Sequence, residues 1–210
     1  YSKWNFNDSI MATLFVDKLD PQSGTALEIG TSGDTVTVPS GATFNVAGTL
    51  QSGGSAITQG ITGADQWRIT ASVTSDGDIT ANLERSDRTA AAQGSMGLLM
   101  TQSSGVFTFP ATGYWLVRFD ATGQSTGADN LSMAMRVTID NANYYQPAYC
   151  SQGVAGAHTT YAAAQSILDV TDLSNVKVKF NAQSLAAGSL WYGDTNENYT
   201  YFTFIRLGDT

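Results

Sequence analysis

The chain has 210 residues, a net charge of −8 and only 13% charged residues. A hydrophobic content of 42% is enough for a packed core and excludes a disordered chain. The ten Lys and Arg residues are scattered rather than gathered in a stripe, so we expect no nucleic-acid partner. No apolar run approaches the roughly 20 residues that cross a bilayer, which argues against membrane insertion. A single cysteine, Cys150, excludes a disulfide within the chain.

The first 22 residues carry several large apolar side chains. Trp4, Phe6 and Phe15 are too apolar for a tail left in water. Two interpretations stay open, since such an arm can pack on its own domain or dock onto a neighbouring subunit. We interpret residues 1–22 as an attachment arm that binds other proteins of an assembly, with these three residues as its candidate anchor.

Residues 23–60 are rich in Gly, Ser and Thr and contain three short alternating segments, 26–29, 35–38 and 43–46. Each offers only two apolar side chains on one face: Leu27 and Ile29, Val36 and Val38, Phe44 and Val46. Two such groups cannot offset the ordering entropy of a lone chain, but they can if three chains share one axis. We therefore predict a short-stranded trimeric β stalk. A flexible linker is the alternative, and it fits residues 48–60 best.

Residues 61–210 read as a series of alternating strands separated by turns. The central stretch, 105–120, has a Pro/Gly turn between two strand segments, and we interpret it as a hairpin. Strands at this spacing predict an all-β, two-sheet jelly-roll sandwich as the head. Two strands, 114–119 and 199–207, are apolar on both faces, so we expect one face in the core and the other between protomers. The candidate core and trimer-interface residues are Trp115, Tyr201, Phe202 and Phe204.

Few residues in the sequence suggest catalysis or metal binding. His158 is the sole histidine, which excludes a histidine-based triad within one chain. A ring of three His158 side chains around a threefold axis is the alternative to an ordinary loop residue. The segments 76–78 and 194–198 are oxygen-rich, as in a calcium site or a tight turn, but neither has the spacing of a known calcium loop. We expect no enzyme activity, no metal and no cofactor.

The central stretch resembles the signature of the complement globular-head and tumour-necrosis-factor superfamily. The matching residues are Gly105, Phe107, Pro110, Gly113 and Trp115, with Trp where the superfamily usually has Tyr. The aromatic segment 199–207 is similar to the strand that closes the inner sheet in that superfamily. This resemblance covers residues from about 62 to 210 and implies a trimeric jelly-roll head.

Four segments, 11–24, 33–41, 64–70 and 203–208, resemble fibre proteins of tailed phages, especially phages of marine bacteria and cyanobacteria. The first ten residues depart from the start of those proteins. The resemblance implies a homotrimeric structural fibre on the tail or capsid of an extracellular virion. Two alternatives stay open: a purely structural decoration protein without a receptor, and a glycan-cleaving fibre enzyme, which would need a pair of carboxylates in a groove.

A fibre touches its host at the end far from its anchor, so we expect recognition by loops at the distal end of the head. The segment 141–161 is the predicted host-contact loop. It gathers Tyr144, Tyr145, Tyr149 and His158, and tyrosine rings suit glycan and protein partners alike. The alternative is that these tyrosines pack inside the sandwich.

Overall fold

The computed structural model describes residues 19, 21, 23–52, 54–56 and 60–210. The chain divides into two compact units, residues 1–57 and 58–210, and each is described by itself. The predicted anchor residues Trp4, Phe6 and Phe15 lie outside the described residues.

In the described part of the first unit, the only strands are β1 (Gln51–Ser52) and β2 (Ser55–Ala56), which form a small antiparallel ladder. The segments 26–29, 35–38 and 43–46, predicted as strands of a three-chain stalk, form no strand in the single chain. Their six apolar residues are 37–67% exposed. A strand needs a neighbour to take its backbone hydrogen bonds, so three-chain assembly of this segment stays a prediction.

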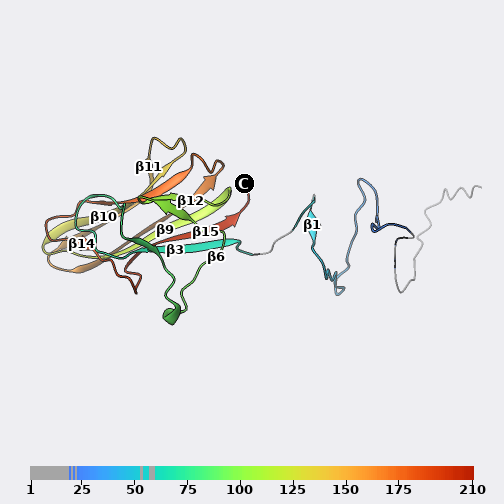
Figure 1. Ribbon diagram of the computed structural model, residues 1–210, viewed down its shortest axis with the longest axis horizontal. Coiled ribbons are helices and arrows are strands. Elements are labelled where there is room, and N and C mark those ends of the chain that lie inside the picture. Colours follow the sequence, from blue (N-terminus) through green and yellow to red (C-terminus); the bar gives the residue numbers. More distant parts are fainter. Residues whose placement is uncertain (1–18, 20, 22, 53, 57–59) are drawn as a thin grey trace, which may run out of the picture. The chain divides into compact units, whose positions relative to one another are not determined.

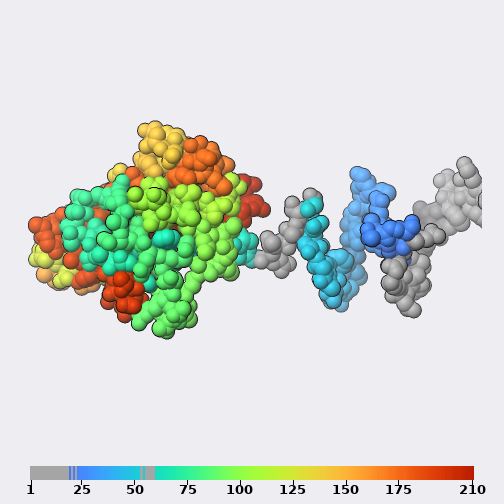
Figure 2. Space-filling view, viewed as in Figure 1, coloured from blue at the N-terminus to red at the C-terminus, as the bar shows by residue number. Residues whose placement is uncertain are grey.

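The second unit is an all-β sandwich of two antiparallel sheets, as predicted (Figure 1). The six-stranded sheet contains β4 (Gly77–Asp78), β7 (Thr101–Ser103), β8 (Val106–Thr108), β10 (Ala128–Thr138), β11 (Tyr145–Ala155) and β13 (Lys177–Gln183), in the order β11-β10-β13-β8-β7 with β4 on β13. The seven-stranded sheet contains β3 (Gly63–Ile69), β5 (Leu83–Arg85), β6 (Met96–Gly97), β9 (Gly113–Gln124), β12 (Thr159–Val170), β14 (Leu190–Trp191) and β15 (Thr200–Gly208), in the order β12-β9-β15-β3-β5. A loop carrying the short helix η1 (Thr89–Ala91) projects from the sandwich (Figure 2).

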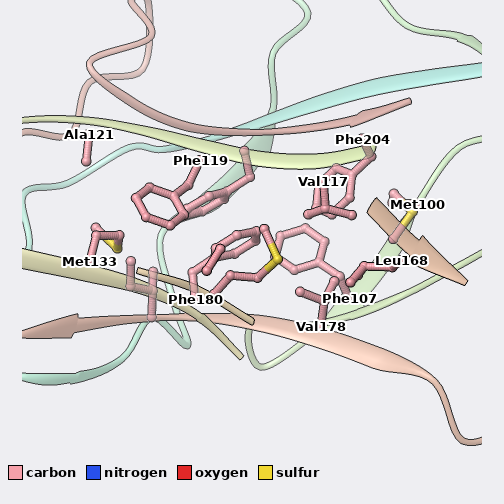
Figure 3. Close-up of a cluster of buried hydrophobic side chains, with 14 of the residues drawn as sticks. Met100, Phe107, Val117, Phe119, Ala121, Met133, Leu168, Val178, Phe180 and Phe204 are labelled. Atoms are coloured by element: carbon pink, nitrogen blue, oxygen red, sulfur yellow. The ribbon is translucent and has the colours of Figure 1, made fainter. Parts of the chain in front are cut away.

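The core lies between the sheets and is dominated by aromatic rings (Figure 3). Phe180 from one sheet stacks on Phe202 from the other, with ring centroids 3.8 Å apart and planes within 6°. Phe107 contacts both and lies 5.1 Å from the Phe204 ring. Trp115, Phe202 and Phe204 have no exposed surface. Of the candidate core or interface residues, these three therefore belong to the core.

The predicted hairpin of residues 105–120 is not a hairpin. Its strands form as expected, but β8 pairs with β13 and β9 pairs with β12 and β15, so the connection crosses between sheets. The reason is that both strands point rings into one core, where Phe109 and Trp115 lie 5.4 Å apart. Gly113 at the crossing has φ 128°, and a Cβ there would lie 2.2 Å from the Gly208 carbonyl oxygen. Only glycine fits this position.

Strand pairing defines two ends of the sandwich. At the entry end, β3 begins at Gly63 and β15 ends at Gly208, which pairs with Tyr114. The turn of residues 139–144, between β10 and β11, lies at this end as well, because Thr138 pairs with Lys177 and Lys177 with Thr108, close to the crossing. At the far end are the turns 125–127, 156–158 and 184–189.

Candidate functional site

The outward side of the seven-stranded sheet, here called the open face, is uncovered in the single chain. Its side chains stand in rows across four strands, since Leu116 on β9 pairs with Ile167 on β12 and Ile205 on β15, which in turn pairs with Ala64 on β3. In the next row Arg118 lies between Gln165 and Thr203. These residues alternate with the core residues Trp115, Val117 and Phe119, as the period of a strand requires.

At the entry end the open face is apolar. Tyr114, Ile167 and Leu207 are 43%, 61% and 51% exposed. With Gly208 and Asp209 they line a shallow hollow of about 480 Å³. Large apolar side chains gathered on one side of a sheet typically mark an interface.

Toward the far end the open face carries a charged cluster. The guanidinium of Arg118 donates from Nε to Asp120 at 2.7 Å, and the Tyr161 hydroxyl donates to the same carboxylate. The side chain of Asp120 is 3% exposed. Hydrogen bonding to Asp120 raises the pKa of Arg118, while burial and the Asp120 carboxylate raise the pKa of Tyr161. The charge of Asp120 is therefore paired within its own chain, and this part of the face needs no partner to satisfy it.

A second hollow, of about 400 Å³, lies on the same open face, over β3 and β15. Its floor is formed by Ala64 and Gln66 of β3 and by Thr203 and Ile205 of β15. Its wall is formed by Ala92, Gly94 and Ser95 of the projecting loop and by Met96 of β6. The open face therefore combines an apolar surface on β9 and β12 with a hollow on β3 and β15.

Tyr201, the fourth candidate core or interface residue, lies on the open face, half-buried and opposite Asp120. Its burial and the nearby Asp120 raise the pKa of its phenol. The sequence interpretation missed Ile167, Leu207 and Tyr161 as members of this face. The sequence of 161–170 predicts a strand despite its Ala-rich start, but nothing in its spacing shows that it lies beside β9.

The predicted host-contact loop, residues 141–161, is wrong as a loop. Most of it is β11, which runs from the entry end to the far end, followed by the start of β12. Tyr144 and Tyr145 therefore lie at the entry end and His158 at the far end, separated by the length of β11, about 37 Å at ~3.4 Å per residue. The single proline and many small residues of this segment masked its strand character. A role for these residues in host contact stays a prediction.

Tyr149 lies between these two positions, on the outward side of the six-stranded sheet opposite Ala134. It is partly exposed, and its hydroxyl donates to Ser132 Oγ at 2.8 Å. Next to it, the Gln183 side chain donates to the Gln146 side-chain oxygen at 3.2 Å. None of the four tyrosine and histidine candidates packs inside the sandwich core.

Of the two oxygen-rich segments, 194–198 forms a bend, whereas 76–78 leads into strand β4. Asp194 accepts hydrogen bonds from the amides of Asn196 and Glu197, which lower the pKa of its carboxyl group. The Asp76 carboxylate accepts a hydrogen bond from the Leu185 amide, and Asp78 forms an ion pair with Lys179. Among the described residues, no three His, Cys, Asp or Glu side chains gather in a way that would hold a metal ion. Within the same residues, no helix is long and apolar enough to cross a membrane.

Solved structures with the same fold include a tumour-necrosis-factor protein, Eiger of S. frugiperda, and murine APRIL. Eiger is 13% identical, with a TM-score of 0.51 over 70% of this chain and 93% of its own. APRIL at pH 5.0 is 7% identical, with a TM-score of 0.52 over 69% of this chain and 98% of its own. The globular domain of the zebrafish complement 1qA protein is 14% identical, with a TM-score of 0.45.

No protein-family model matches the sequence, and no curated protein matches it. The likeness to Eiger and APRIL confirms the jelly-roll head that the central stretch implied. At these identities it shows the fold alone.

Proposed function

We propose that the chain is a structural, non-enzymatic fibre protein of a virus particle, that it forms a homotrimer, and that its head contacts the host-cell surface. The observation that carries self-association is the open face. Its apolar end exposes Tyr114 and Leu207 on the inner strands β9 and β15 and Ile167 on the edge strand β12, where a soluble monomer would place polar side chains.

A threefold arrangement suits the asymmetry of the open face. The apolar surface on β9 and β12 and the hollow on β3 and β15 lie side by side on one protomer. In a heterologous contact the apolar surface of one protomer packs against the hollow of its neighbour, and three such contacts close a ring. The exposed apolar pairs at Leu27 and Ile29, Val36 and Val38, and Phe44 and Val46 support the same assembly, because each pair needs other chains to cover it.

Placement on a virion rests on the resemblance of four sequence segments to fibre proteins of tailed phages. In that setting the first 22 residues bind another virion protein and the head is carried outward. The outward side of the six-stranded sheet faces away from the open face, so it stays accessible in such a trimer.

Analytical ultracentrifugation of the purified chain tests self-association. We expect a trimer at micromolar concentration, with more than the ~1,600 Å² of an ordinary interface buried in all. A folded monomer that persists at that concentration would contradict the proposal. Immunogold imaging of intact particles with an antibody against residues 61–210 tests the virion location, and unlabelled particles would exclude it.

The tyrosines at the entry end provide a test of host contact. We expect replacement of Tyr144 and Tyr145 by Ser to reduce binding of the head to host cells, because the exposed ring of Tyr145 and the Tyr144 ring beside Lys179 are lost. Three heads per fibre add avidity, so single-site contacts can be weak. Trimer content and melting temperature serve as controls, and unchanged binding with both intact would remove these residues from the contact surface.

A further inference from the structure

The outward side of the six-stranded sheet places two cations directly opposite each other. Arg136 on β10 pairs with Lys179 on β13, and Lys177 follows on the same face of β13. Three of the ten Lys and Arg residues of an acidic chain therefore stand on two neighbouring strands. Like charges directly across a strand pair repel each other and lower the stability of the pair unless an acidic group lies beside them.

Lys179 has partners within the chain. Its Nζ lies 2.7 Å from Asp78 Oδ2 and 3.9 Å from the centroid of the Tyr144 ring. Asp78 also accepts a hydrogen bond from the Asn181 amide at 2.8 Å, so its oxygens are already occupied. The one carboxylate in this cluster is thus committed to Lys179 and Asn181.

Arg136 has no such partner. No hydrogen bond or ion pair between described residues uses its guanidinium, and its Nε is buried with no acceptor. A guanidinium offers five donors in a planar fork that matches a carboxylate, sulfate or phosphate. A buried donor without an acceptor is costly. Because Nε itself has almost no exposed surface, an oxyanion arriving from solvent would bond to the two terminal nitrogens of the guanidinium, which form no hydrogen bond between described residues.

The aromatic neighbour of this cluster is held in place. Asp140 accepts hydrogen bonds from the amides of Ala142 and Asn143, at 3.0 and 2.8 Å, and from the Asn143 side chain at 2.7 Å. These bonds fix the turn that presents Tyr144, and Asn141 adopts a left-handed φ of 56° within it. The ring is therefore positioned beside Lys179 before any ligand arrives, which lowers the entropy lost on binding.

We propose that this face, defined by Arg136, Lys179, Tyr144 and Tyr149, binds an acidic saccharide through its oxyanion. Arg136 is the ligand for the carboxylate or sulfate, Lys179 adds positive potential, and the tyrosines contact the sugar ring. The proposal rests on the proposed function, since it names the chemistry of the host surface that the head contacts. Nothing in it requires the open face, so the site stays usable in a trimer.

The test uses the purified full chain and three tetrasaccharides: one of uronic acid, one sulfated and one neutral. Isothermal titration calorimetry is run at low and high NaCl. We expect binding of an acidic tetrasaccharide that weakens with salt, and no binding of the neutral one. A preference for uronate or for sulfate identifies which oxyanion the face takes.

Variants at Arg136 test whether this residue binds the oxyanion. We expect Arg136→Gln to weaken acidic saccharide binding by about tenfold or more, as loss of a charge-assisted hydrogen bond predicts, and Arg136→Lys to retain part of it. Arg88→Gln is the matched control, because Arg88 belongs to the projecting loop region and bonds the Asn196 carbonyl. Melting temperatures of all three variants verify folding.

Equal binding by Arg136→Gln and the unmodified chain would overturn the proposal, as would equal binding of the neutral tetrasaccharide or no binding at millimolar concentration. Cell adsorption of the same proteins separates this result from the proposed function. If Arg136→Gln loses saccharide binding but still adsorbs to cells, the use of this site in host contact is contradicted, while host contact by the head is not. A trimer that binds acidic saccharide but no host cell contradicts host contact alone.

Discussion

The two sheets of the sandwich share one core but differ on their outward sides. The open face of the seven-stranded sheet leaves Tyr114, Ile167 and Leu207 exposed to water. The six-stranded sheet instead covers its small central residues, Ser132 and Ala134, which have no exposed surface. The difference teaches that alternation within a strand does not decide what its outward side is for. The small central residues of the six-stranded sheet need no further cover, whereas the apolar side chains of the open face gain free energy when another protein covers them.

The largest expected effect comes from a substitution in the core that both sheets share. Phe204→Ala should cost about 3–5 kcal/mol per protomer, because its ring is fully buried and contacts Phe107 and Phe180 from the opposite sheet. Chemical denaturation of the head measures this loss. Phe44→Ala is the control, since Phe44 is exposed in the single chain and should leave the melting of the head unchanged. Near-neutral results at both Phe202 and Phe204 would contradict their place in the core.

The second prediction tests whether the open face, unlike the rest of the surface, forms the trimer interface. Ile167→Lys should weaken the trimer by tenfold or more, because a charge would be buried in an apolar contact, a cost of several times the ~1.4 kcal/mol of one decade. Ile139→Lys is a matched control, since Ile139 is 70% exposed and lies outside the open face. Sedimentation equilibrium measures both. Equal weakening by the two variants would contradict an interface at the open face.

The smallest expected effect concerns pH. Hydrogen bonds from the Asn143 side chain and the backbone amides of Asn143 and Ala142 hold the pKa of Asp140 well below its ordinary value of 3.8, and similar turns lower the pKa values of Asp172 and Asp194. Carboxyl groups with lowered pKa values stabilise the fold above pH ~4, and this contribution is lost as pH falls through their folded-state values. The melting temperature should therefore fall below pH ~4.

Asp140→Asn sharpens this test. The variant lacks the charge at every pH, so its melting temperature should lie below that of the unmodified chain at pH 7. The difference between the two melting temperatures should narrow toward pH 2, where the Asp140 carboxyl of the unmodified chain is losing its charge. A gap that stays constant with pH would mean that the Asp140 charge contributes nothing to stability.

Much of the fold was predictable from the sequence because strand alternation is a local property. Leu131, Met133 and Met135 alternate along β10 and are buried, and the same holds for Val178 and Phe180 on β13. Strand pairing is not local. The crossing at Pro110–Gly113 looked like a hairpin turn, because the same Pro and Gly residues serve a connection between sheets.

The candidate site was predictable only in part for the same reason. Tyr201 and Phe202 could be placed on opposite faces of one strand because they alternate, but the sequence did not show which of the two faces fills the core. Ile167 could not be placed beside Leu116, since 51 positions of the chain separate them and only the fold brings them together. The cluster of Arg136, Lys179 and Tyr144 was missed because it joins a turn to two strands, and no pattern in any one segment indicates it.

The sandwich begins and finishes at one end, where β3 starts at Gly63 beside the last residues of β15. A domain whose first and last strands lie side by side can be exchanged for another at a single junction, as domains with neighbouring termini often are. A reporter joined after Gly208 would emerge on the entry side and leave the turns 125–127 and 156–158 unobstructed. Exchange of one such head for another would change the surfaces that the protein presents without any redesign of the residues before Gly63.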